Sequence, residues 1–300
     1  MAKIKIMCTS TGCIEYAPER YRNMGIDIIR VHVIFEGKEY LEGIGLDPVD
    51  FYNRLETISD PKKNLPKTAI PTAGEIAAHF DRAIEEGYDE IIAYAISSGL
   101  GGTYNAIRLV ANDYADKIKI HVVDTKITSF VEGLLSVRAQ EMVNAGKSSE
   151  EILAETVWAL RHQEFIGIDG KLDYLIYNGR LKGGKAFMGQ LLNICPVVHF
   201  NKNGECVAKE SVRTPKKALA RTCEIVKEMI GDRDPKDYIL FHVYTGTSML
   251  DTLLLIEEKY GLKTNHEAVI MSPVSGSHNG PWLAGYGLLF LRREDEPLED

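Results

Sequence analysis

The chain has 300 residues, of which 45% are hydrophobic and 26% are charged. This length and composition are typical of a globular protein of about two domains. The formal net charge is -8 and the isoelectric point is near 5.6. Because duplex binding depends on lysine and arginine side chains that neutralise phosphates, this charge argues against nucleic acid as a general partner.

The cysteines and the lack of long apolar runs indicate where in the cell the protein is located. The five cysteines are odd in number and show no C-x-x-C spacing, which favours reduced thiols over a disulfide framework or a zinc site. The first residues lack the apolar core of a signal peptide, and no run approaches the roughly 18 apolar residues of a membrane span. We therefore predict a cytoplasmic protein without a metal site.

The first half of the chain alternates strands with helices. We predict strands at 4–7, 28–35, 90–96 and 118–123, and helices at 47–55, 73–86, 102–114, 128–144 and 149–159. Asp47 and Pro48 are the residue types of a helix N-cap and first turn. This order of elements predicts a parallel sheet covered by helices.

The second half has a different order of elements. We predict strands at 165–168, 197–200, 205–210, 238–244, 268–271 and 287–291, and helices at 215–229 and 248–259. This order predicts a second domain with a mixed sheet. Because no proline- or serine-rich linker separates the halves, we expect domains 1–164 and 165–300 to pack tightly around a shared cleft.

The segment 92–104 carries the clearest functional signal, since a buried strand runs into a glycine-rich turn and then into a helix. Ser97 and Ser98 end the strand, and Gly101 and Gly102 precede the helix. Backbone N–H groups at a helix N-terminus and two hydroxyls would bind a carboxylate or a phosphate. The alternative is that the serines cap the helix and the glycines form a turn.

Three further segments are candidates for ligand binding. His278 lies in a polar turn, where it is either a carboxylate donor or a solvated loop histidine. Thr68 lies in an extended segment between two prolines, which is alternatively a rigid linker with Thr72 as the next N-cap. Ser10 and Thr11 follow the first strand, at the carboxyl end of a parallel sheet where ligands collect.

Basic side chains and missing motifs narrow the partners. Arg180 with Lys182 and Lys185 forms one basic stretch, and Arg213 begins another; such stretches are usually solvated. The chain has no Gly-x4-Gly-Lys-Ser/Thr loop and no Gly-x-Gly-x-x-Gly after a strand. We therefore expect no bound nucleotide and no cofactor.

Together these segments resemble the DegV family, in which the lipid-binding subunits of fatty acid kinase hold a fatty acid in a tunnel between two domains. The resemblance spans nearly the whole chain. The segments that carry it are Ser10 with Thr11 and residues 35–40, 66–75, 97–104, 123–125, 178–180, 189–196 and 278–281.

The resemblance implies a two-domain α/β fold with a parallel-sheet N-terminal domain, a mixed-sheet C-terminal domain and a ligand tunnel between them. It implies that the carboxylate of a long-chain fatty acid is bound by Thr68, Ser97, Ser98 and His278. The other expected pocket residues are Ser10, Thr11, Ile70, Gly101, Gly102, Asn279 and Trp282.

The resemblance also implies partners. Arg180 and Arg213 would lie where such a subunit meets a separate fatty acid kinase, which supplies ATP and makes an acyl phosphate for phospholipid synthesis. The protein would then be a carrier that contacts a membrane transiently, and not itself an enzyme.

The sequence departs from the family pattern around the expected head group. Thr9 replaces a usual Asp, Ala69 and Ile70 replace Ser-Gln, and Gly101 replaces a Ser. Asn279 and Trp282 replace a Thr and a Gly. Fewer hydroxyls and bulkier side chains predict a different acyl chain or a different ligand.

Two other functions remain open at this point. A serine acyl hydrolase would use Ser97 as nucleophile, His278 as base and Asp124 to orient the histidine, although no oxyanion segment of the His-Gly-Gly type is evident. A small-molecule sensor would instead have a short, polar pocket for a sugar or an amino acid.

Overall fold

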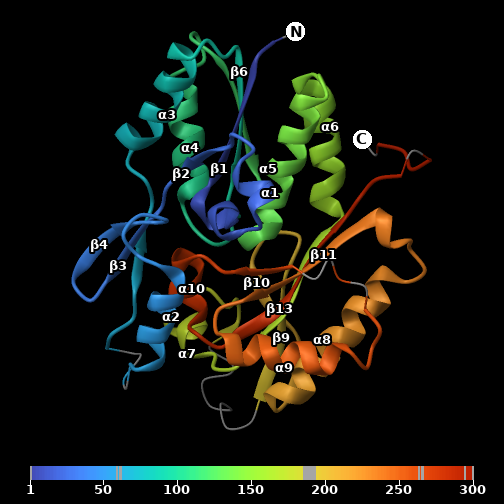
Figure 1. The fold of residues 1–300 in the computed structure, drawn as a ribbon. Coiled ribbons are helices and arrows are strands. Elements are labelled where there is room, and N and C mark those ends of the chain that lie inside the picture. The colour runs from blue at the N-terminus through green and yellow to red at the C-terminus, as the bar shows by residue number, and fades with distance from the viewer. Residues whose placement is uncertain are drawn as a thin grey trace.

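Three β-sheets organise the computed structural model, which describes residues 2–58, 60, 63–184, 194–262, 264, 267–293 and 295–298. A four-stranded sheet forms the upper unit in Figure 1, a six-stranded sheet forms the lower unit, and a small three-stranded sheet lies beside their junction. Lys185 and residues 189–193 of the family-like segment 189–196 lie outside the described residues.

The first sheet is parallel throughout, in the order β2-β1-β6-β7. Its strands are β1 (Ile4–Thr9), β2 (Asp27–Ile29), β6 (Glu90–Ala95) and β7 (Lys119–Asp124). The helices that cover it are α3 (Ala73–Glu85), α4 (Thr103–Asn112), α5 (Ser129–Asn144) and α6 (Ser149–Arg161). Alternate side chains of a strand point to opposite faces, so Ile91 and Ala93 pack with α3 and α4, whereas Ile92 and Tyr94 pack with α5. The predicted parallel sheet is confirmed.

Helix starts in this unit follow the capping signals of the sequence. The Asp47 carboxylate accepts the backbone N–H of Asp50 and so caps α2 (Pro48–Glu56). Thr72 and Glu75 form a reciprocal capping box at the start of α3. Thr72 is therefore the N-cap that the sequence indicates.

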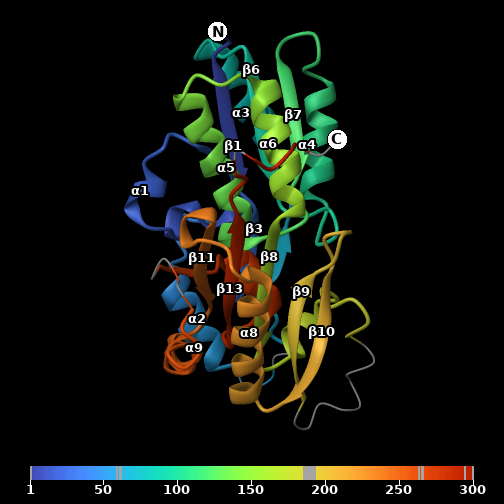
Figure 2. The same ribbon diagram turned by 90° about the vertical axis from the view of Figure 1, so that its right-hand side faces the viewer.

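The second sheet is mixed, in the order β10-β9-β8-β13-β11-β12. Its strands are β8 (Gln163–Asp169), β9 (Ile194–Phe200), β10 (Cys206–Arg213), β11 (Tyr238–Tyr244), β12 (Ala268–Ile270) and β13 (Leu283–Phe290). Its described neighbours are antiparallel except β11 and β12. The long helix α8 (Pro215–Ile230) runs along this sheet and packs against α9 (Thr247–Glu257) (Figure 2). The predicted α/β fold, with a parallel sheet followed by a mixed one, is confirmed.

The prediction of a single strand over 28–35 was wrong, because these residues form two short strands that belong to different sheets. The chain leaves the parallel sheet after β2, and the backbone N–H of Val31 donates to the Ser10 hydroxyl. It then forms a small antiparallel sheet of β3 (His32–Phe35), β4 (Lys38–Leu41) and β5 (Lys67–Ala69), in the order β4-β3-β5. Glu36 and Gly37 turn the hairpin with positive φ, as tight hairpin turns require.

A second correction concerns His278, which lies on a helix and not in a polar turn. The helix is α10 (Pro273–Asn279); Ser272 caps it by accepting the N–H of Ser275, and proline occupies its first turn. The short run of serines and glycine has no apolar periodicity, so the pattern indicated a turn.

The remaining elements are η1 (Ser10–Gly12), η2 (Ile14–Tyr16), α1 (Glu19–Arg22), α7 (Asp173–Tyr177) and η4 (Pro235–Asp237).

The change from the first sheet to the second comes at β8, which starts at Gln163. The predicted domains 1–164 and 165–300 stay a prediction, because the small sheet and α2 contact α10 of the second half. Among the described residues, no helix combines the length and apolar composition needed to cross a membrane.

Candidate functional site

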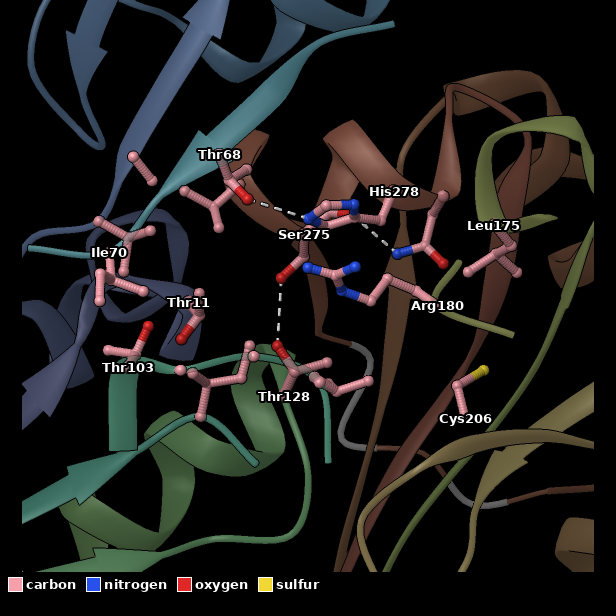
Figure 3. A pocket seen from close by; sticks show the side chains of 18 of the residues that line it. Thr11, Thr68, Ile70, Thr103, Thr128, Leu175, Arg180, Cys206, Ser275 and His278 are labelled. Carbon is pink, nitrogen blue, oxygen red and sulfur yellow. Dashed lines mark hydrogen bonds between the residues drawn. The ribbon is translucent and has the colours of Figure 1, made fainter. Parts of the chain in front are cut away.

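A pocket that is partly open to solvent lies where segments of both halves of the chain meet (Figure 3). Its apolar wall consists of Val31, Ala69, Ile70, Ile96, Leu100, Leu175, Phe200, Cys206 and Val274. Its polar side chains are Thr11, Thr68, Thr103, Thr128, Arg180, Ser275, His278 and Asn279.

Thr68 and His278 meet across the pocket, as Figure 3 shows. Pairing with β3 fixes Thr68 on β5, and α10 carries His278 toward it. The Thr68 Oγ1 and His278 Nε2 atoms are 3.2 Å apart. Burial, together with the positive charge of Arg180, lowers the pKa of His278 to about 3. The imidazole is therefore neutral at physiological pH, with one nitrogen that donates and one that accepts.

Arg180 reaches into the same part of the pocket, between His278 and Ser275 in Figure 3. Its Nη1 donates to the backbone carbonyl of Asn178 at 2.8 Å. The Nε atom of Arg180 and the Nδ1 atom of His278 are buried, and neither has a hydrogen-bond partner among the described residues. Among the described pocket residues, these two nitrogens are the buried side-chain polar atoms without a partner.

The N-terminal end of α4 forms another side of the pocket. Gly101, Gly102 and Thr103 line it, and Gly102 at the N-cap supplies no side chain to the free N–H groups. The positive end of a helix dipole favours an anion. Ile70, which is 46% exposed, approaches Gly102 at this mouth of the pocket.

Thr128 and Ser275 connect the two halves of the chain at the pocket. Their hydroxyl oxygens are 3.1 Å apart (Figure 3). Thr128 precedes α5 in the first half, and Ser275 lies on α10 in the second. Neither residue could be predicted from the sequence, because each becomes a pocket residue only through tertiary contacts.

Ser97 and Ser98, the predicted carboxylate ligands, do not line the pocket. The Ser97 hydroxyl is fully buried and donates to the carbonyl of Gly204 at 2.8 Å. The Ser98 hydroxyl accepts from Lys126 Nζ at 3.2 Å. Both side chains hold loops together, so the turn of the alternative interpretation is present. Neither serine caps α4, whose N-cap is Gly102 without a side-chain hydrogen bond.

The arrangement also fails to assemble the hydrolase triad. Ser97 is bonded to a backbone carbonyl, while His278 contacts Thr68. Asp124 forms an ion pair with Lys126 at 2.6 Å; although burial opposes it, the Lys126 and Ser98 hydrogen bonds lower the pKa of Asp124 overall. The nucleophile, base and orienting carboxylate of this alternative do not contact one another.

The other predicted pocket residues divide into two groups. Those that line the pocket are Thr11, Ile70, Gly101, Gly102 and Asn279. Ser10 does not, since its hydroxyl accepts the N–H of Val31 at 3.1 Å. Trp282 packs against Tyr174 instead, with Lys171 Nζ 3.6 Å above its ring. The large side chain of Trp282 therefore does not line the pocket.

The predicted kinase-contact arginines lie in different surroundings. Arg180 is half-buried in the pocket wall, whereas Arg213 is exposed at the end of β10.

Metal ligands are not gathered anywhere in the described ranges, since no three His, Cys, Asp or Glu side chains are grouped to hold an ion.

Comparison with known proteins identifies the family of this fold and site. Residues 3–291 match the family model described as uncharacterised protein, DegV family. The chain belongs to the DegV family. A DegV domain-containing protein of Listeria innocua is 30% identical over 94% of this chain and 97% of its own length. One of Clostridium acetobutylicum is 28% identical over 96% of this chain and 99% of its own.

Solved DegV structures share the fold over almost their full length. A fatty-acid-binding DegV family protein of Streptococcus agalactiae is 29% identical, with a TM-score of 0.86 over 97% of this chain and 100% of its own. DegV of Bacillus subtilis, described as a fatty acid binding protein, is 26% identical, with a TM-score of 0.80 over 97% of this chain and 100% of its own.

Proposed function

We propose that this DegV-family protein binds a long-chain fatty acid in the pocket, with the carboxylate held by Thr68, His278 and Arg180. The observation that carries the proposal is the half-buried Arg180 beside a neutral histidine in a largely apolar pocket, because its buried Nε has no partner among the described residues. A buried guanidinium is satisfied by an anion that accepts its hydrogen bonds. An amphipathic acid matches both the cationic group and the apolar wall.

Burial of the acyl chain would drive the formation of such a complex. Burying an acyl chain gains about 0.8 kcal/mol per methylene, on the order of 10 kcal/mol for a 16-carbon chain before ordering costs. An unpaired carboxylate would offset much of this gain, so the donors of the pocket are required. The N–H groups at the start of α4 add a favourable dipole.

The family relatives support the same ligand. The Streptococcus agalactiae and Bacillus subtilis proteins are described as fatty-acid-binding, and each is covered completely by the likeness to this chain. Because both identities are above a quarter and the whole fold is shared, a similar ligand class is the simplest expectation for this pocket.

We further propose that the protein is a carrier and not itself the catalyst. It would present the carboxylate at the pocket mouth to a separate ATP-dependent fatty acid kinase, whose acyl phosphate feeds phospholipid synthesis, with transient membrane contact. The proposed setting is the cytoplasm. Arg213 is exposed and free to contact a partner, whereas Arg180 serves the ligand in this proposal.

A binding titration tests the ligand and its head-group residues. Thr68→Val and Arg180→Gln each remove a hydrogen bond to a charged group, worth about 1.5–3 kcal/mol, and should weaken palmitate binding by about tenfold or more. Ser98→Ala is the matched control, since its hydroxyl bonds Lys126 outside the pocket. Unchanged affinity in Arg180→Gln, or a native protein that takes up neither palmitate nor oleate, would overturn the proposal.

A further inference from the structure

A buried acidic residue lies directly behind one wall of the pocket. Glu132 is on α5, and its side chain is 0% exposed. Thr11 separates it from the pocket, since Thr11 lines the pocket and its Oγ1 is 3.0 and 2.9 Å from the two carboxyl oxygens of Glu132. The carboxyl is not used in the head-group contacts described above.

Three groups, the hydroxyls of Thr9 and Thr11 and the carboxyl of Glu132, form a closed ring at this position. The Thr11 Oγ1 lies 2.8 Å from the Thr9 Oγ1, and the Thr9 hydroxyl in turn donates to Glu132 Oε1. Thr9 Oγ1 also accepts the backbone N–H of Ile96 at 3.1 Å. Each of the three sides of the ring is therefore at hydrogen-bond distance.

The number of protons in the ring identifies the charge of Glu132. Two threonine hydroxyls supply two protons, but three short oxygen–oxygen contacts need three. A protonated Glu132 supplies the third: Glu132 donates to Thr11, Thr11 to Thr9, and Thr9 back to Glu132. An ionised Glu132 would leave one pair of oxygens in contact without a proton between them.

The surroundings agree with a neutral carboxyl. The other ionisable groups that face Glu132 are thiols, Cys8 of β1 at 3.9 Å and Cys13 after η1, and burial raises the pKa of both. No Lys, Arg or His forms an ion pair with Glu132 in the part of the chain that the structure describes. Burial raises the pKa of Glu132 to about 8, although hydrogen bonds from Thr9, Thr11 and Cys8 lower it.

We infer that Glu132 is a positioning residue of the ligand site, which holds Thr9 and Thr11 through a shared proton and favours an anionic ligand while its own carboxyl is neutral. The inference rests on the proposed fatty acid function. Ionisation would break the ring and add a negative charge behind the wall that an anionic ligand contacts. By linkage, a bound anion must also make Glu132 harder to ionise.

The test is a palmitate titration from pH 7 to pH 9.5 with the native protein and Glu132→Gln. Affinity of the native protein should fall by about tenfold as Glu132 ionises, which corresponds to a coupling of about one pK unit. Glu132→Gln keeps a neutral donor and acceptor in the ring, so its affinity should stay flat. Because palmitate is the same in both titrations, its own ionisation cancels in the comparison.

Glu42 serves as the control, since it is another buried carboxyl and burial raises its pKa to about 7. It accepts the N–H of Val274 and does not touch the ring. Glu42→Gln should retain the fall in affinity at alkaline pH. His278 stays neutral over this range, and arginine stays charged.

The outcomes separate the two proposals. Palmitate binding that does not change with pH in the native protein would overturn the role of Glu132 and leave the fatty acid function standing. Absence of palmitate binding at every pH would overturn both. If Glu132→Gln fails to fold, infrared spectroscopy of the native protein replaces it. The carbonyl band of a protonated carboxylic acid should persist to higher pH with palmitate bound than without it. A band that disappears at the same pH in both states would contradict the inference.

Discussion

The side chains of Thr68 and His278 are 210 positions apart in the sequence and 3.2 Å apart in the structure. The resemblance to a family pointed to both, and neither periodicity nor composition could have paired them. Arg180 was expected at a protein interface, but it lies in the pocket because the turn after α7 directs it inward. Short sequence motifs identify which residues matter better than they identify what each residue contacts.

Glu132 shows what sequence reasoning could not supply at this scale. Its one visible signal is an acidic residue within the buried stretch of α5, where every neighbour from Ser129 to Val137 is also buried. The meaning of that signal depends on Thr9, which stands where the family pattern has an Asp. In this chain β1 supplies a hydroxyl at Thr9 in place of that Asp, and the carboxyl that contacts it is Glu132 of α5.

The lowered pKa of His278 predicts that the free energy of unfolding depends on pH. Its folded-state pKa of about 3 lies below the ordinary value of 6.5, so the neutral imidazole favours folding above pH 6.5. That contribution is lost as the pH falls from 6.5 toward 3. Between pH 7 and pH 5, native protein should lose about 2 kcal/mol more unfolding free energy than His278→Gln, as measured by urea denaturation. Equal losses in the two proteins would mean that the folded imidazole takes up a proton as readily as the unfolded one, so that its pKa is not lowered.

At the scale of elements, strands and helices with clear periodicity were predictable and short ones were not. The alternation of apolar runs and helical patterns predicts the parallel sheet, because both of its faces are buried. The small sheet was missed since β5 has only three residues and pairs with a strand far along the chain. Helix α10 was missed because its sequence is mostly small and polar.

The packing of α5 on η1 predicts the effect of a single methyl group. A Cβ added at Gly133 would lie 2.1 Å from the carbonyl oxygen of Gly12. Gly133→Ala should therefore push η1 and Thr11 away from α5 and destabilise the protein by about 1–3 kcal/mol, measured by chemical denaturation.

A second helical glycine serves as the control for that variant. A Cβ at Gly74 on α3 meets nothing within 4 Å. Gly74→Ala should be neutral or stabilise the protein by up to about 1 kcal/mol. If both alanine variants were equally stable, the close approach of α5 to η1 would be wrong.

At the scale of the whole molecule, the order of elements predicts two sheets of different type, and the structure shows both, with a pocket lined by segments of the two halves. The sequence could not reveal how the halves share it, because segments near Thr11, Thr68, Thr128, Arg180 and Ser275 converge only after folding. The pocket at this junction makes ligand binding a property of both halves. A bound ligand should therefore stabilise the entire chain.

The measurement that tests the central claim most directly is native mass spectrometry of the purified protein beside His278→Ala and Ser98→Ala, followed by extraction of the bound molecule. The account predicts a stoichiometric fatty acid on the native protein and on Ser98→Ala, and a reduced occupancy on His278→Ala. An empty native protein that also refuses added palmitate, or equal loss of lipid in the two variants, would contradict it.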